Sequence, residues 1–124
     1  MQADLRSLAR QVYDAINVQD LVVLDRLFSP DIVRHAMGEV GIEAAKRAVA
    51  NAFAASPSLR FEVEDVIADG DRVALRVVVY RNEGTEAAER SMILEIFRVE
   101  NGQVVEIWGA GAPAPGRSSA GGQR

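Results

Sequence analysis

The sequence predicts an α+β fold, with helices in its first half and antiparallel strands in its second. In residues 4–55, apolar side chains recur every three or four positions in three segments, which is the spacing of an amphipathic helix. From residue 59 onward, apolar and polar residues alternate, as is typical of strands with one buried face. We therefore expect three helices packed against an antiparallel sheet.

The three helices are expected at residues 4–18, 21–28 and about 42–55. Asp4 is a suitable N-cap for the first helix, because its side chain can accept a hydrogen bond from a free backbone N–H. The second helix should stop before Pro30, since the residue preceding a proline avoids the α region. The third is rich in alanine, the strongest helix former.

The strands are expected after the second and third of these helical segments. A short strand covers residues 32–36, and residues 37–41 form a loop. Two long hairpins follow, with turns at Asp69-Gly70-Asp71 and at Asn101-Gly102, where residues tolerate the positive φ of tight turns. The four hairpin strands are expected at residues 59–68, 72–82, 91–99 and 103–108, with a polar connection at residues 83–89.

The strand at residues 91–99 carries one carboxylate in an apolar row. Alternation places Met92, Leu94 and Ile96 on one face, and Ile93, Glu95, Phe97 and Val99 on the other. Burying an unpaired charge costs much free energy, so Glu95 should face either a pocket or water. Which face of residues 72–82 points inward is left open.

The composition argues against several classes of function. The 124 residues suffice for one domain at residues 1–110, and the Gly-, Pro- and Ser-rich residues 111–124 are expected to form a flexible tail. A net charge of −4 argues against nucleic acid as a partner, and no apolar run reaches the roughly 18 residues of a membrane span. With no cysteine, one histidine and no apolar leader, we expect a cytoplasmic protein without metal or organic cofactor.

The order of these elements resembles the nuclear transport factor two-like superfamily, and within it the SnoaL-like polyketide cyclases and the ketosteroid isomerases. Residues 31–35, 69–73 and 97–108 carry the resemblance, which covers residues 4 to 110. It implies a cone-shaped, curved, mostly antiparallel sheet wrapped around three N-terminal helices and enclosing a pocket. Because this fold hosts many reactions, the resemblance specifies the fold more narrowly than the chemistry.

The resemblance also implies site residues. In ketosteroid isomerases a carboxylate at the end of the first strand is the general base, and the ungapped match places His35 there. A carboxylic acid three residues before an Arg donates a hydrogen bond to the oxyanion, and that position is Glu95. A second donor is a tyrosine on the first helix; the match puts Val12 there, with Tyr13 about 100° away around the helix.

Each candidate has an alternative interpretation. Histidine ordinarily titrates near neutrality and suits acid–base work, but His35 can also be a strand-end residue that bonds a loop carbonyl. Glu95 can donate as a neutral acid, orient His35 as an anion, or pair with Arg98 or Arg76 on the outer face. The pocket is expected to be lined by Val12, Tyr13, Phe28, Met37, Phe53, Ile93, Phe97 and Trp108.

The implied function is an isomerase or cyclase that moves a proton on a hydrophobic, polyketide- or steroid-like carbonyl compound without a cofactor. The histidine and aspartate of the SnoaL-like cyclases have no counterpart here, which leaves a non-catalytic binding or dimerisation domain as an alternative. An epoxide-opening or lactone-forming cyclase is a second alternative, which would pair Glu95 with Asp31 or Glu83. Apolar residues on both faces of residues 72–82 predict a homodimer formed through the outer face of the sheet.

Overall fold

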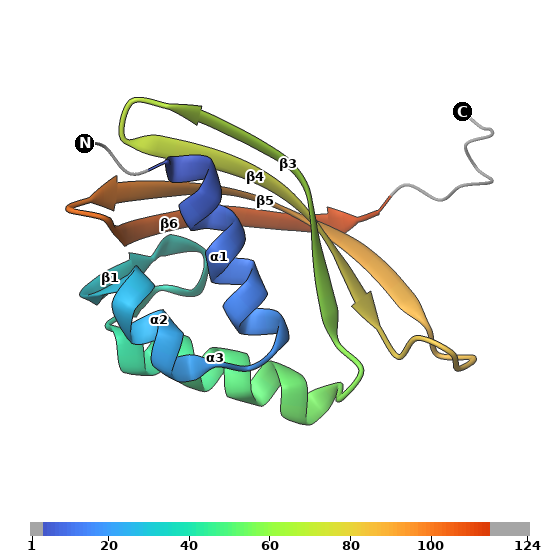
Figure 1. The fold of residues 1–124 in the computed structure, drawn as a ribbon. Helices are drawn as coiled ribbons and strands as arrows, with labels where there is room; N and C mark the ends of the chain where they lie inside the picture. Colours follow the sequence, from blue (N-terminus) through green and yellow to red (C-terminus); the bar gives the residue numbers. More distant parts are fainter. Residues whose placement is uncertain (1–3, 115–124) are drawn as a thin grey trace.

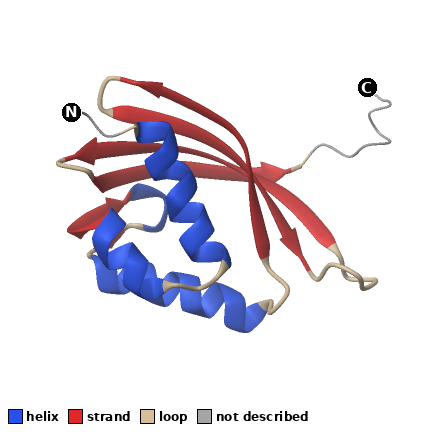
Figure 2. Ribbon diagram, in the orientation of Figure 1, coloured by secondary structure: helices blue, strands red, loops and turns tan. Residues whose placement is uncertain are grey.

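A computed structural model of the protein describes residues 4–114 and confirms the α+β class. Three helices lie together on one side of a six-stranded curved sheet (Figures 1 and 2). The elements are α1 (Leu5–Asn17), α2 (Leu21–Leu27), β1 (Phe28–Arg34), a 3₁₀ turn η1 (His35–Met37), β2 (Glu39–Val40), α3 (Ile42–Ala55), β3 (Arg60–Asp69), β4 (Arg72–Arg81), β5 (Glu89–Glu100) and β6 (Gln103–Pro113).

The sheet is mostly antiparallel, as expected, with the strand order β2-β1-β6-β5-β4-β3. Within the described residues, one pair of strands is parallel and joins β1 to β6, so the first described strand lies beside the last. The turn between β5 and β6 has φ of 52° at Asn101 and 76° at Gly102, which explains the Asn-Gly sequence there. Within residues 4–114, no helix is long and apolar enough to cross a membrane.

The helices begin and end close to the expected positions. Asp4 caps α1 by accepting a hydrogen bond from the backbone N–H of Arg6 at 3.0 Å. The third helix has the expected bounds. The apolar stripe of α1 is buried against the sheet and consists of Leu8, Ala9, Val12, Tyr13 and Ala15.

The strand β1 is longer than expected and begins at Phe28, within the segment expected to end the second helix. Pro30 does not stop the strand, because the pairing of β1 with β6 is irregular between Phe28 and Val33. The loop expected at residues 37–41 instead contains the end of η1 and the short strand β2. At the other end, β6 runs to Pro113; residues 115–124 of the expected tail lie outside the described residues.

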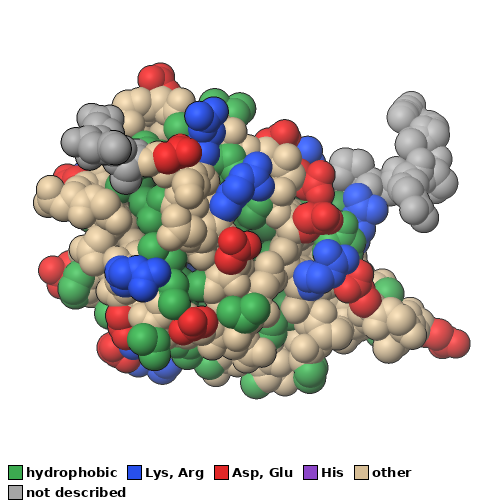
Figure 3. Space-filling model, viewed as in Figure 1, with side chains coloured by type: hydrophobic (Ala, Val, Ile, Leu, Met, Phe, Trp, Pro, Cys, Tyr) green, Lys and Arg blue, Asp and Glu red, His purple; other side chains and the backbone are tan. Residues whose placement is uncertain are grey.

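Burial shows which face of β4 points inward. Val73, Leu75, Val77 and Val79 are all buried under the helices, so this row is the inner face. Arg76 and Tyr80 lie on the outer face, where Arg76 pairs with Asp65. Figure 3 shows basic and acidic side chains interspersed over the side of the molecule that it presents.

Candidate functional site

A tyrosine–glutamate pair lies between the helices and the inner face of the sheet. Tyr13 comes from the buried stripe of α1, and only 6% of it is exposed. Its hydroxyl donates a hydrogen bond to Oε1 of Glu95 on β5. The Phe61 ring packs 5.4 Å from the tyrosine ring. Glu95 therefore faces inward, as its position in the apolar row suggested, and the structure brings Tyr13 rather than Val12 to it.

Gly109 makes the space that the Glu95 side chain occupies. Gly109 lies directly opposite Glu95 in the β5–β6 pairing, on the same face of the sheet. A Cβ atom at position 109 would stand only 3.2 Å from Cγ of Glu95. The absence of a side chain on β6 therefore lets the carboxyl group sit against the strand and turn toward α1.

The surroundings raise the pKa of both partners. Burial raises the pKa of Glu95 above its usual range, while the hydrogen bond from Tyr13 and the charge of Arg34 act against this shift. Burial, together with the Glu95 charge and hydrogen bond, raises the pKa of Tyr13 well above its usual value. The carboxylate is consequently a stronger base than an exposed glutamate, and the tyrosine holds its proton.

A second pair, Arg34 with Glu39, lies on the same face at the end of β1. Arg34 is paired in register with Ile107, which belongs to the buried core, so its side chain points inward. Its Nη1 donates to Oε1 of Glu39 at 2.7 Å. Glu39 in turn lines a hollow of about 570 Å³. The other residues that line this hollow are Met37, Ala44, Arg47, Ala48, Asn51 and Ala52.

The structure does not bring His35 and Glu95 together. The His35 ring stacks on Trp108 with centroids 5.0 Å apart, and its Nε2 lies 2.7 Å from Oε2 of Glu106. Glu106 and Trp108 flank the buried Ile107 on β6, so both point to the outer face. His35 and Glu95 therefore lie on opposite faces of the sheet.

The expected pocket residues separate into several places. Trp108 lies on the outer face, which corrects its placement in the pocket, because it alternates with the buried Ile107. Val12, Phe28 and Phe97 are buried in the core, with Ile93 packed against them. Met37 lines the hollow beside α3, and Phe53 lines another of about 450 Å³.

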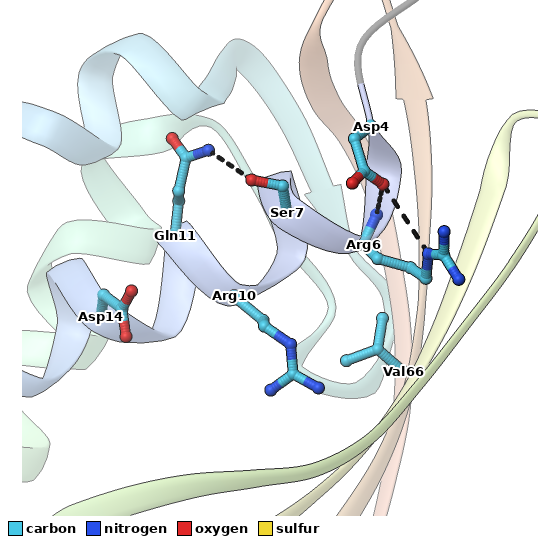
Figure 4. Close-up of a pocket in the computed structure, with 7 residues that line it drawn as sticks. All are labelled: Asp4, Arg6, Ser7, Arg10, Gln11, Asp14 and Val66. Carbon is cyan, nitrogen blue, oxygen red and sulfur yellow. Dashed lines mark hydrogen bonds and ion pairs between the residues drawn. The ribbon is translucent and has the colours of Figure 1, made fainter.

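The hollows described here open at the surface, and neither Tyr13 nor Glu95 lines them. A third, of about 490 Å³, runs along the polar side of α1 near Arg10 and Val66 (Figure 4). The carboxylates considered as partners of Glu95 are elsewhere: Glu83 pairs with Arg60 at 2.9 Å, and Asp31 is exposed on β1. Among residues 4–114, no three His, Asp or Glu side chains are arranged to hold a metal ion.

Sequence reasoning missed Arg34, Glu39 and Gly109. A signal for the first existed, because Arg34 shares alternation parity with the apolar Ile32 and so belongs to the inner face. The same parity places His35 on the outer face. Gly109 could not have been identified, since its importance depends on the register between β5 and β6.

Comparisons with known proteins agree with the observed fold. A family model described as the SnoaL-like domain matches residues 9–107. IdmH, a candidate polyketide cyclase from Streptomyces antibioticus, is 25% identical over 85% of this chain and 89% of its own, with a TM-score of 0.78. AclR, a candidate hydroxylase from Streptomyces galilaeus, is 29% identical over 88% of this chain and 79% of its own, with a TM-score of 0.73.

A SnoaL-like polyketide cyclase from Agrobacterium tumefaciens has a TM-score of 0.78 over 89% of this chain and 92% of its own. At 17% identity, this likeness shows the fold alone. None of the curated proteins matches the sequence.

Proposed function

The chain belongs to the SnoaL-like domain family, and on that premise we propose that it is an isomerase or cyclase acting on a hydrophobic, polyketide- or steroid-like carbonyl compound. The observation that carries the proposal is the hydrogen bond from the Tyr13 hydroxyl to the Glu95 carboxylate on the inner face of the sheet. A hydrogen-bond donor beside a base of raised pKa is what proton transfer next to a carbonyl requires. The reaction needs no cofactor.

In the proposed step, the Tyr13 hydroxyl turns from Glu95 to the carbonyl oxygen of the substrate. Glu95 accepts the proton from the adjacent carbon, and the electrons of the broken C–H bond form an enolate whose oxygen is bound by Tyr13. Glu95 then returns the proton to another carbon. Alternatively, the enolate carbon attacks a second carbonyl carbon of the same molecule and closes a ring; the π electrons of that C=O bond pass to its oxygen, which takes the proton from Glu95. This assignment makes Glu95 the base, a role that the resemblance had given to His35.

Hydrogen exchange tests this step without knowledge of the product. A panel of aromatic methyl ketones is incubated with the protein in D₂O, and deuterium next to the carbonyl is followed by NMR. We expect exchange with the unaltered chain, and a loss of roughly 10²–10³-fold in Tyr13→Phe, which removes one donor to the enolate oxygen. Glu64→Gln, which alters an exposed carboxylate on β3, is the matched control. Exchange that is unaffected by Tyr13→Phe would refute the donor role.

His35→Ala separates the two candidate bases. A general base contributes roughly 10²–10⁴ in rate, so exchange should fall by that factor if His35 abstracts the proton. We expect a change of less than about twofold, because His35 lies on the face of the sheet opposite Glu95. A large loss of exchange in a folded His35→Ala protein would show that His35, on the outer face, is the general base instead of Glu95.

The second candidate function is a non-catalytic domain that binds a small molecule. The separation of His35 from Glu95 favours it, since the acid–base constellation implied by the resemblance is divided between two faces. Ketones that bind near Tyr13 without exchanging deuterium would support this function over the enzyme.

We also propose that the chain forms a homodimer through the outer face of the sheet. Ile67, Ala74, Ile96 and Trp108 are aligned across β3, β4, β5 and β6 in one apolar row on that face. Leu94, in the next row, is 51% exposed, and Ile96 is 42% exposed. Asp65 and Arg76 lie beside these residues, so a second copy related by a two-fold axis can match apolar to apolar and acid to base.

Leu94→Arg should therefore produce a monomer. Light scattering at micromolar concentration should give about twice 13.4 kDa for the unaltered chain and about 13.4 kDa for the variant, because each Leu94→Arg interface would bury unpaired charges. Val22→Arg, at an exposed position on α2, is the control and should leave the dimer intact. A monomeric unaltered chain would disprove the dimer.

A further inference from the structure

The Arg34 guanidinium is partly buried and uses few of its donors. Its side chain is 25% exposed. An arginine carries five N–H donors in a planar fork, and the described residues accept one hydrogen bond from Arg34, at Oε1 of Glu39. The remaining donors are therefore available to oxygen atoms that come from outside the chain.

The local backbone explains why Glu39 holds Arg34. The two residues form a cross-strand pair between β1 and β2, so their side chains share one face. The chain reverses through η1 and Gly38, whose φ of 64° is readily adopted by glycine. Glu39 thus contacts Arg34 and also lines the hollow of about 570 Å³ beside α3.

Arg34 also acts electrostatically on the proposed catalytic pair. Arg34 lies on the same inner face of the sheet as Glu95, and its charge acts against the rise in pKa that burial causes at Glu95 and Tyr13. An anionic ligand bound to Arg34 would offset this charge. The basicity of Glu95 would then rise when such a ligand binds.

We propose that Arg34 determines specificity: it selects carbonyl compounds bearing a planar two-oxygen anion, either a carboxylate or a 1,3-dicarbonyl enolate, which enter by the α3 hollow and displace Glu39. The guanidinium fork matches two coplanar oxygens in a bidentate arrangement. Glu39 occupies Arg34 until the ligand replaces it, and its carboxylate then meets water at the hollow. This inference rests on the proposed function, whose Tyr13–Glu95 pair receives the rest of the ligand.

Binding of three probes with one ring system tests the proposal. The probes are 2-naphthoate, 1-(2-naphthyl)butane-1,3-dione and the neutral 2-naphthalenemethanol, each titrated by calorimetry into the full chain at pH 8. We expect the naphthoate or the dione to bind at least about tenfold more tightly than the alcohol. Tight naphthoate binding identifies a carboxylate ligand; tight dione binding with the absorption of the enolate identifies a dicarbonyl.

Substitutions test which residue causes the tighter binding of the anions. Arg34→Gln should weaken binding of the anions by about tenfold or more and leave the alcohol unchanged, and Arg34→Lys should recover part of the loss, because it keeps the charge without the fork. Glu39→Gln should strengthen binding of the anions, since it removes the competing carboxylate but keeps an acceptor oxygen for Arg34. Arg10→Gln, at an exposed position on α1 outside this hollow, is the control and should change binding by less than about twofold. Arg47→Gln, on the wall of the hollow, is compared as the other arginine beside the entry route.

Other outcomes would overturn the assignment of Arg34. One is that Arg34→Gln weakens binding of the anions and of the alcohol equally. Another is that Arg47→Gln weakens binding of the anions and Arg34→Gln does not. The third is that neither anion binds the unaltered chain. Exchange of neutral ketones by Glu95 would survive each of these results, so the proposed function would stand. Conversely, if Arg34 selected anions but the protein exchanged no ketone hydrogens, the proposed catalytic function would be wrong and the role of Arg34 in binding would stand.

Discussion

Glu95→Ala and Glu95→Gln should each lower the rate of hydrogen exchange, or of turnover once a substrate is known, by roughly 10²–10⁴. Both substitutions remove the carboxylate proposed to take the proton, which is also the group that the Tyr13 hydroxyl contacts. Equal losses are expected because neither amide nor methyl can accept a proton from carbon. The measurement is the NMR exchange rate at saturating ketone, with Glu64→Gln as the matched carboxylate control.

A different ranking would change the mechanism. If Glu95→Gln retained most of the activity and Glu95→Ala did not, Glu95 would be a neutral hydrogen-bond donor, a role that an amide can share. The pH profile gives an independent check. Because burial raises the pKa of Glu95, the exchange rate should fall as the pH drops through a value above the usual range of a carboxyl group.

The same shift has a consequence for stability. A carboxyl group whose pKa is higher in the folded than in the unfolded chain favours folding below the unfolded value, and this contribution disappears as the pH rises through the folded value. Glu95→Gln should therefore be relatively more stable than the unaltered chain at pH 8 than at pH 4. Urea unfolding at the two pH values compares the free energies.

Phe97→Ala should lower the free energy of unfolding by about 3–5 kcal/mol. Phe97 is 1% exposed and is the largest of the fully buried side chains in the described residues. Its removal leaves a cavity among the helices and the inner face of the sheet, which the packed neighbours can fill only in part. Urea unfolding followed by circular dichroism at a fixed protein concentration measures the change.

Ile96→Ala is the matched control from the adjacent position on β5. Its side chain is 42% exposed on the outer face, so the substitution should cost less than about 1.5 kcal/mol when both variants are made in the Leu94→Arg background, where the proposed dimer does not form. All variants are compared in that background and at one concentration, because the proposed dimerisation would make apparent stability depend on concentration. Similar costs for the two substitutions would contradict the assignment of the two faces of β5.

Local patterns predicted most of the architecture. The bounds of α3 were predicted in full, and the alternation in residues 91–99 correctly put Glu95 and Phe97 on the buried side. Helix and strand periodicity depend on neighbouring residues only, and one buried face is enough to impose them. The strand β1 was less well predicted, since an irregular pairing with β6 accommodates Pro30.

In the candidate site, too, local pattern determined some features and tertiary structure decided the others. By itself, the sequence determined that Glu95 is an isolated carboxylate in an apolar row, because alternation along one strand settles that point. Only the tertiary structure decided that Tyr13 reaches Glu95, that Gly109 leaves room for it, and that His35 stacks on Trp108 across the sheet. These contacts join residues 82, 14 and 73 positions apart, and they depend on helix placement and strand register, which no local periodicity encodes.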